Sequence, residues 1–233
     1  MAGADRSIWL RVANGVESLS GQGPRVWNEP PAVANALREL LSVLPITHVQ
    51  IDLAALRRRH EPRAQWKAML SREGDWHELL RELVAAVDDA VRGRAAWGLG
   101  LPGPDGVADE LGDPSERGVL KAGLQLAGFL QGFREAGVGF VSVDLTGARV
   151  SEKAVAPIFR NAQMYGWKRA AIVGDDSASA AGAEVRLVDR LSERLWTADE
   201  PAPQGPTWFG EIPPGIEPAA IVAAGRKLHG WRD

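Results

Sequence analysis

The chain has 233 residues, 45% of them hydrophobic, and its 30 acidic and 27 basic residues give a net charge of −3. This length suits one large α/β domain or two small ones, and no apolar run approaches the roughly 20 residues of a membrane-spanning helix. The absence of cysteine excludes disulfides, thiolate zinc sites, iron–sulfur clusters and cysteine nucleophiles.

The composition also sets expectations about location and partners. Residues 1–6 lack the apolar core of a signal peptide, so we expect a cytoplasmic protein without a membrane partner. No basic stripe stands out along the sequence, and nucleic acid is therefore not an expected partner. The sequence gives no reason to expect a cofactor.

Short apolar segments separated by helical or turn-rich sequence predict strands. Several of these segments are almost continuously apolar, which is typical of strands buried on both faces of a parallel sheet. Residues 95–145 fit one strand–helix–strand unit of such a sheet. The predicted strands are Ile8–Val12, His48–Leu53, Ala96–Leu101, Phe140–Leu145, Ala170–Val173 and Thr207–Ile212.

Helices with recognisable ends are predicted between these strands. One of them begins with Asp113 as an acidic N-cap, has Pro114 at its first position, and is expected to bury Leu120, Leu124, Ala127 and Leu130. The others run from Pro30 to about Leu44, from Trp76 to Val91, from about Ser151 to Tyr165, and from Glu217 to His229.

The alternation of strands and helices predicts either a parallel barrel or a doubly wound sheet. Six or seven strand–helix units are slightly fewer than the eight of a complete barrel, for which about 250 residues are typical. We therefore predict a single α/β domain over residues 1–233, a TIM-barrel-like parallel barrel that is incomplete or compressed.

Four stretches in the C-terminal part of the chain carry a family resemblance. They are the glycine-proline turn Gly103-Pro104-Asp105-Gly106-Val107-Ala108, the glycine turn and strand Glu135-Ala136-Gly137-Val138-Gly139-Phe140-Val141-Ser142-Val143-Asp144, the helical segment Ala156-Pro157-Ile158-Phe159, and Phe209-Gly210-Glu211-Ile212-Pro213-Pro214. In this order they resemble the uroporphyrinogen decarboxylase and cobalamin-independent methionine synthase superfamily of TIM barrels. The resemblance implies a barrel whose ligand binds at the carboxyl ends of the strands.

The chain also departs from that superfamily in ways that bear on chemistry. The methionine synthase branch binds zinc through histidine and cysteine, whereas this chain has no cysteine and its histidines are scattered at 48, 60, 77 and 229. The decarboxylase branch begins with an arginine-rich signature that nothing before Arg57 matches. Neither zinc-dependent thiol methylation nor the substrate uroporphyrinogen is therefore expected.

Asp52 and Asp144 are the candidate catalytic residues, because each ends an apolar strand. In a barrel this position faces the ligand, and a carboxylate there can act as a general base or stabilise a cation. We predict that the two side chains converge on one cavity. The alternative is structural: each carboxylate caps the following helix or pairs with an arginine.

Four further residues are candidate substrate-binding groups. Arg11 lies near the end of the first strand, Asn14 follows that strand and Glu211 lies in the last, so they could share a pocket in which the guanidinium binds a carboxylate or phosphate. The alternative is a salt bridge across the mouth of the barrel. Trp208 could stack on a planar ligand, or it could simply fill the core.

A metal site has a weaker basis. Asp175 and Asp176 follow a predicted strand and would suit Mg²⁺, but the same residues also fit a helix N-terminus or a solvated loop. No two histidines have the spacing of metal ligands, and we assign no metal residue. Residues 57–63 are expected to form a solvated, charged helix face or loop, with anion binding as the alternative.

Together these observations predict a small-molecule-binding barrel protein, in its enzymatic form a cofactor-independent, decarboxylase-like lyase acting on an anionic or planar substrate. Two alternatives stay open: a catalytically degenerate subunit of a larger complex, and a methyltransferase working with a corrinoid or folate partner. An incomplete barrel exposes a sheet edge or an apolar face, so we expect a homodimer or hetero-complex.

Overall fold

The computed structural model describes residues 6–60, 66–71, 75–146, 152–174, 182–188, 191, 193–197 and 207–232. Seven strands form a parallel sheet in the order β6-β5-β4-β3-β2-β1-β7. The strands are β1 (Ser7–Arg11), β2 (His48–Asp52), β3 (Ala96–Leu101), β4 (Phe140–Asp144), β5 (Lys168–Ile172), β6 (Val185–Leu187) and β7 (Thr207–Glu211).

The strand order identifies the fold class. Each strand from β1 to β6 lies beside its neighbour in the sequence, and β7 pairs with β1. In a doubly wound sheet the order of the strands reverses at a switch point. In a barrel the strands follow one another in a single direction, and the last strand lies beside the first. The protein therefore has the predicted α/β, TIM-barrel-like fold.

Helices connect most of the strands. They are α1 (Ala13–Ser20), α2 (Pro30–Val43), α3 (Leu53–Arg59), α4 (Trp66–Ser71), α5 (Asp75–Val91), α6 (Pro104–Glu110), α7 (Glu116–Leu130), α8 (Glu152–Met164), α9 (Arg194–Thr197) and α10 (Pro218–Arg232), with 3-10 turns η1 (Gly23–Asn28) and η2 (Gln131–Phe133). Among them, none combines the length and the apolar composition that a membrane-spanning segment requires.

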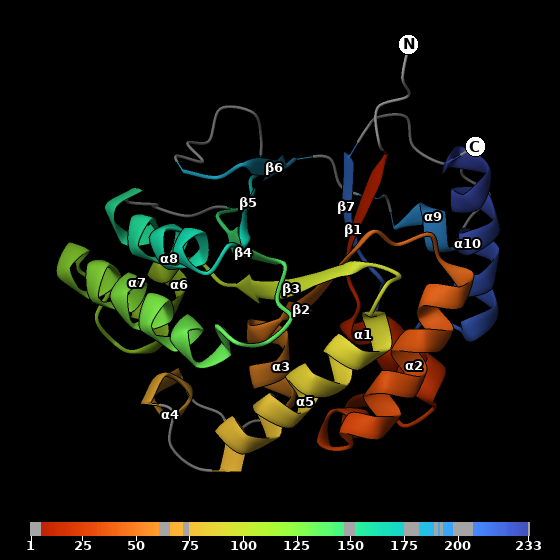
Figure 1. Cartoon of the computed structure of the whole chain (residues 1–233), viewed down its shortest axis with the longest axis horizontal. Coiled ribbons are helices and arrows are strands. Elements are labelled where there is room, and N and C mark those ends of the chain that lie inside the picture. Colours follow the sequence, from red (N-terminus) through yellow and green to blue (C-terminus); the bar gives the residue numbers. More distant parts are fainter. Residues whose placement is uncertain are drawn as a thin grey trace. The chain divides into compact units, whose positions relative to one another are not determined.

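The chain divides into two compact units. The first unit contains residues 1–51, 82–97 and 189–233, and the second contains residues 52–81 and 98–188. In the first unit β7 lies beside β1, and α1 packs against α2 (Figure 1). The α2 helix begins at Pro30, and its buried face includes Val33, Leu37 and Leu40.

In the second unit, α7 and α8 lie side by side (Figure 1). Their backbones approach closely because Gly123 has no side chain: a Cβ atom at this position would lie only 2.0 Å from the carbonyl oxygen of Ala154. Beneath them, β4 pairs with β3 and β5 in parallel register.

The start of α7 differs from the prediction. Ser115, not Asp113, is the N-cap, because Ser115 has the extended backbone of a cap and its hydroxyl accepts a hydrogen bond from the Gly118 N–H at 3.1 Å. Asp113 accepts a hydrogen bond from the Ser115 hydroxyl at 2.5 Å, and this bond holds the pKa of Asp113 below its usual value. Asp113 thus orients the cap residue.

The buried face of α7 was predicted correctly in part, since Ala127 and Leu130 are buried as expected. Leu120 is half-buried and Leu124 is 61% exposed. Besides Ala127 and Leu130, the helix turns the small residues Ala122 and Gly123 inward, together with Leu126. Small side chains are needed here because α8 lies so close, and a leucine would not fit between the two backbones.

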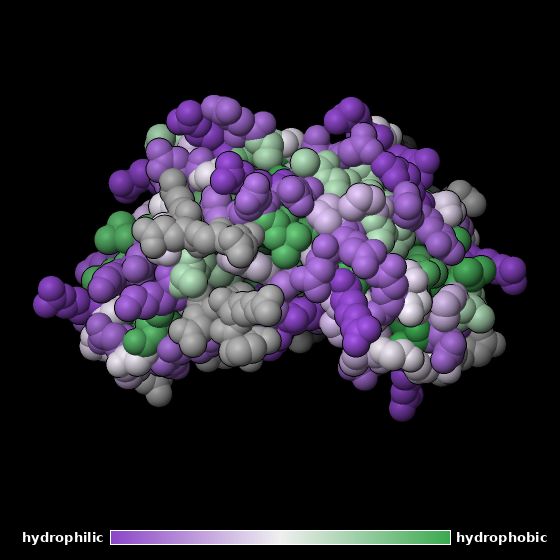
Figure 2. All heavy atoms as spheres, turned by 90° about the horizontal axis from the view of Figure 1, so that it is seen from below, coloured by the Kyte–Doolittle hydropathy of each residue, from purple (hydrophilic) through white to green (hydrophobic). Residues whose placement is uncertain are grey.

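Figure 2 shows one face of the molecule, where hydrophilic side chains predominate and apolar ones form small separate patches.

Candidate functional site

Three polar side chains form one row across neighbouring strands of the first unit. Arg11 at the end of β1 is in register with Gln50 of β2 and with Glu211 at the end of β7. Residues in register on paired strands project from the same face of a sheet. The preceding row on this face contains Trp9 and His48, whose rings stack with centroids 3.8 Å apart. We call Arg11, Gln50 and Glu211 the strand-end row.

Arg11 is the cation of the strand-end row. Its guanidinium carbon lies 5.2 Å from the centre of the Phe209 ring, and its Nη1 lies 3.8 Å from Oε2 of Glu211. This separation is longer than a hydrogen bond, so the pair is electrostatic. The Arg11 side chain is only 16% exposed, compared with 46% for Glu211. The positive charge is thus more desolvated than its counter-charge.

Asn14 fixes the carboxylate of Glu211 in place. Asn14 lies in the first turn of α1, and its Nδ2 donates to Oε1 of Glu211 at 3.2 Å and to the carbonyl of Ile212 at 2.7 Å. The structure therefore brings together Arg11, Asn14 and Glu211, three of the four predicted binding residues. The geometry between Arg11 and Glu211 is that of the salt bridge given above as the alternative.

Gln50 belongs to the same row but was not among the predicted site residues. It is 1% exposed, and within the described part of the chain neither its Nε2 nor its Oε1 has a hydrogen-bond partner. The sequence carries a signal for it: Gln50 is a polar residue between Val49 and Ile51, inside an otherwise apolar strand. Its significance depends on the register with Arg11, which only the structure gives.

Trp208, the fourth predicted binding residue, is not in the strand-end row. It is in register with Ile8, whereas Phe209 and Glu211 are in register with Trp9 and Arg11. Because alternate residues of a strand point to opposite faces, Trp208 projects from the other face of β7.

Asp52 is positioned by the start of α3. It has extended backbone geometry, and its Oδ1 accepts a hydrogen bond from the Ala55 N–H at 3.0 Å. This is the N-cap arrangement that satisfies one of the free backbone N–H groups at the start of a helix. Asp52 therefore has the structural contact given above as the alternative to catalysis.

The cap predicts how Asp52 variants behave. We expect Asp52→Ala to lower the free energy of unfolding by about 1 kcal/mol, because the α3 cap is lost. Asp52→Asn retains an oxygen acceptor and should stay within about 0.5 kcal/mol of the wild type. Chemical denaturation of both variants measures this difference, and equal losses in the two would rule out the capping role.

Asp144 makes a local contact of a similar kind after β4. Its Oδ1 accepts from the backbone N–H of Thr146 at 3.0 Å and from the Thr146 hydroxyl at 2.5 Å. These bonds form an Asx turn at the end of the strand. The backbone there is tightly packed, since a Cβ atom on Gly103 would lie 2.9 Å from the carbonyl oxygen of Asp144. The predicted convergence of Asp52 and Asp144 on one cavity stays a prediction.

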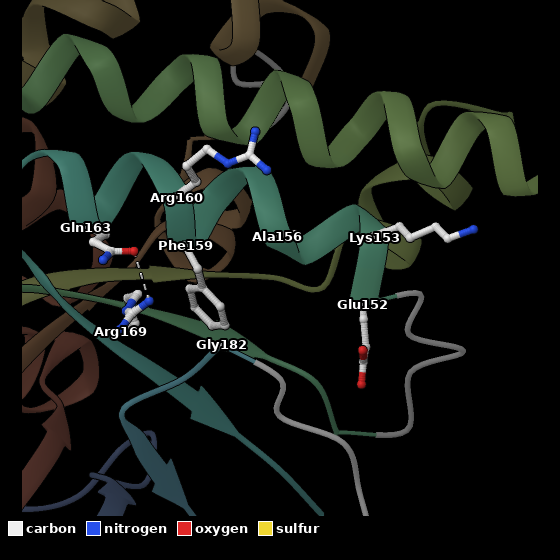
Figure 3. A pocket seen from close by; sticks show the side chains of 8 residues that line it. All are labelled: Glu152, Lys153, Ala156, Phe159, Arg160, Gln163, Arg169 and Gly182. Carbon is white, nitrogen blue, oxygen red and sulfur yellow. Dashed lines mark hydrogen bonds between the residues drawn. The ribbon is translucent and has the colours of Figure 1, made fainter.

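The second unit also contains a cavity of about 440 Å³ beside α8. Figure 3 shows the Phe159 ring pointing away from the helix toward Gly182, and Gln163 directed at Arg169. Arg169 donates to Gln163 at 3.3 Å and pairs with Glu184 at 2.8 Å. The Arg169 guanidinium is thus held by groups of the protein itself. Arg160 projects from the side of α8 opposite to Phe159 (Figure 3).

The structure also bears on the predicted metal ligands and on the predicted charged surface. In the described ranges, no three histidine, cysteine, aspartate or glutamate side chains form a group that could hold a metal ion. Asp175 and Asp176 lie outside the described residues. The prediction of a solvated surface at residues 57–63 was wrong at Arg57, which is buried. The Arg57 guanidinium lies 5.5 Å from the centre of the Trp66 ring and pairs with Glu110 at 2.6 Å.

Comparisons with known proteins yield distant structural likenesses and no match in sequence. No protein-family model matches the chain, and no curated protein matches its sequence. An amidohydrolase from Burkholderia ambifaria, solved with bound Zn, is similar over 65% of this chain and 38% of its own length, with 12% identity and a TM-score of 0.38. A likeness at this level carries no inference about chemistry.

Proposed function

We propose that the protein binds a small organic anion, of which a carboxylate is the simplest form, at the strand-end row. The observation that carries the proposal is the mostly buried Arg11 guanidinium at the carboxyl end of β1, beside Phe209 and 3.8 Å from Glu211. Ligands of parallel α/β proteins bind at the carboxyl ends of the strands. A guanidinium binds carboxylates bidentately, and a ring beneath it suits a planar ligand body.

The enzymatic version of this proposal is a cofactor-independent, decarboxylase-like lyase of the uroporphyrinogen decarboxylase and methionine synthase superfamily. The TIM-barrel-like strand order supports a barrel superfamily of this kind. Asp52 and Asp144, at the ends of β2 and β4, are the proposed polar groups for the reaction. A methyltransferase working with a corrinoid or folate partner has only the sequence resemblance behind it.

A specific observation supports a second candidate, a catalytically degenerate subunit of a larger complex. Both aspartates accept hydrogen bonds from the turns that follow them, as structural residues do. In addition, β6 stands at one end of the strand order with β5 as its partner, and natural proteins cover such an edge strand. A homodimer or a hetero-complex would provide the cover.

Calorimetric titration of the full chain distinguishes these possibilities. The probes are benzoate, cyclopentanecarboxylate and levulinate, together with the corresponding cations benzylamine and cyclopentylamine. We expect at least one carboxylate to bind and neither amine to do so. Binding of amines in preference to carboxylates would refute an anion site.

Glu211→Gln is expected to strengthen carboxylate binding by about three- to tenfold. The substitution removes the negative charge beside Arg11, and such a charge near a protein surface costs a bound anion up to a few kcal/mol before solvent screening is considered. Glutamine keeps an oxygen that can accept the hydrogen bond from Asn14. The same titration measures the change, and Glu184→Gln, which alters the net charge equally in the second unit, is the matched control.

The two variants together make this prediction decisive. If both strengthen binding to the same extent, the effect comes from the net charge of the protein and the strand-end row is not the binding site. Weaker binding in Glu211→Gln would mean that the ligand is held by the carboxylate and is not an anion.

A further inference from the structure

The side-chain amide of Gln50 is in an unfavourable state in this structure. It is 1% exposed, and its donor and its acceptor both lack a hydrogen-bond partner among the described residues. Leaving a buried polar group unpaired destabilises a fold, and most such groups are paired. A hydrophobic residue would fill a central strand position without this penalty, as Val49 and Ile51 do on either side.

The position of Gln50 shows what its amide can contact. In register with Arg11 on the neighbouring strand, Gln50 projects from the same face as the guanidinium and as Glu211. Arg11 and Gln50 are paired residues of neighbouring strands, so their side chains are adjacent on this face. A ligand whose carboxylate binds Arg11 then has its next few atoms at the amide.

We propose that Gln50 selects for ligands that carry, besides the carboxylate, an amide whose N–H and C=O lie on the same edge, as in a lactam, an imide or a primary carboxamide. Such an edge is complementary to a glutamine amide: the ligand N–H donates to Oε1 of Gln50, and Nε2 of Gln50 donates to the ligand carbonyl. Both buried polar atoms are satisfied in the complex. The inference rests on the proposed function, since it places the ligand at the strand-end row.

The expected selectivity follows from the cost of an unpaired group. A site built to hydrogen-bond a polar edge rejects an analogue that lacks the edge, because its own polar atoms stay unpaired in the complex. An amide-free carboxylate of the same shape should therefore bind more weakly by about tenfold or more.

Matched ligand pairs test this by isothermal titration calorimetry on the full chain. The pairs are 6-oxo-1,6-dihydropyridine-3-carboxylate with benzoate, 5-oxoproline with cyclopentanecarboxylate, and succinamate with levulinate. For each pair that binds the wild type, we expect the amide member to bind about tenfold more tightly than the amide-free member. In Gln50→Leu this ratio should fall to about twofold or less, because leucine removes both polar atoms and keeps the volume.

Gln125→Leu is the matched control, since Gln125 lies on α7 in the second unit and also has a buried oxygen without a described partner. It should leave the ratio at its wild-type value. Gln50→Met serves the same purpose as Gln50→Leu if the leucine variant does not fold. Gln50→Leu should also raise the melting temperature, by about 3 °C, because an unpaired buried amide is replaced by an apolar group.

The outcomes separate this inference from the proposed function. Equal affinities within the pairs, or a ratio that survives in Gln50→Leu, would overturn the role of Gln50 while leaving the anion site intact. A fall in the melting temperature of Gln50→Leu would also overturn it, because the amide would then be stabilising the ligand-free fold. If no probe of either kind binds the wild type, the proposed function fails and the role of Gln50 fails with it.

Discussion

Gly123→Ala should lower the free energy of unfolding by about 3 kcal/mol, which for a chain of this size corresponds to a melting temperature about 6–12 °C lower. The added Cβ atom would lie 2.0 Å from the carbonyl oxygen of Ala154 and 2.8 Å from its carbonyl carbon. Both atoms belong to the backbone of α8, so no side-chain rotation can relieve the clash. The helices α7 and α8 would have to move apart.

Gly128 provides the matched control for this substitution. It lies in the same helix, and nothing stands within 4 Å of the position that its Cβ atom would occupy. Gly128→Ala should therefore stabilise the protein by about 0.5–1 kcal/mol, because alanine favours helix more than glycine does. Thermal or denaturant unfolding of the two variants measures the contrast, and similar losses in both would mean that helix packing is not the cause.

Arg11→Met should weaken carboxylate binding by at least about 30-fold, the largest effect expected on the proposed function. Methionine keeps an apolar stem over Phe209 but removes the guanidinium, and each charge-assisted hydrogen bond contributes about 1.5–3 kcal/mol. Titration with the carboxylate that binds the wild type measures the loss. The carboxylate affinity of Arg11→Lys should lie between those of the wild type and Arg11→Met, because an ammonium group keeps the charge but cannot bind a carboxylate bidentately.

Arg38→Met is the matched control for Arg11→Met. Arg38 also belongs to the first unit, where it pairs with Asp89 on α5 and is 40% exposed. Removing its charge lowers the net charge of the protein by the same amount, but the affinity should stay close to that of the wild type. An equal loss in both variants would point to long-range attraction, and an unchanged affinity in Arg11→Met would exclude the strand-end row.

The strands were largely predictable because buried parallel strands are short apolar runs. All six predicted strands are present, and β3 (Ala96–Leu101) has the predicted bounds. The strand that was missed, β6, has only three residues, and the central one, Arg186, is exposed. A segment of this length has too few apolar positions to distinguish it from a loop.

The helices were predicted less well where local sequence and tertiary packing disagree. No helix was predicted over α1, where the dipeptide Asn14-Gly15 is typical of a turn. In the structure Gly15 is helical, and a Cβ atom there would lie 2.4 Å from the Ile212 side chain. Close packing thus explains the glycine, and no pattern within α1 reveals the side chain that lies opposite.

The residues of the candidate site were likewise predictable only in part. Arg11, Asn14 and Glu211 could be identified from the sequence because polar residues at the ends of apolar strands are conspicuous. The register that aligns Arg11 with both Gln50 and Glu211 could not, since it depends on pairing between segments that are distant in the sequence. The same dependence explains why Trp208, although it lies on the predicted strand, projects from the other face.

The pairing of β7 with β1 has a consequence for how the protein is made. The hydroxyls of Ser7 and Thr207 are hydrogen-bonded across a separation of 200 residues. At a synthesis rate of about 5–20 residues per second, β1 leaves the ribosome roughly 10–40 s before this partner exists. Strands β3 to β6 are all available earlier. The N-terminal strand therefore waits with one edge unpaired during synthesis, which is the interval in which a chaperone or a second nascent chain could bind it.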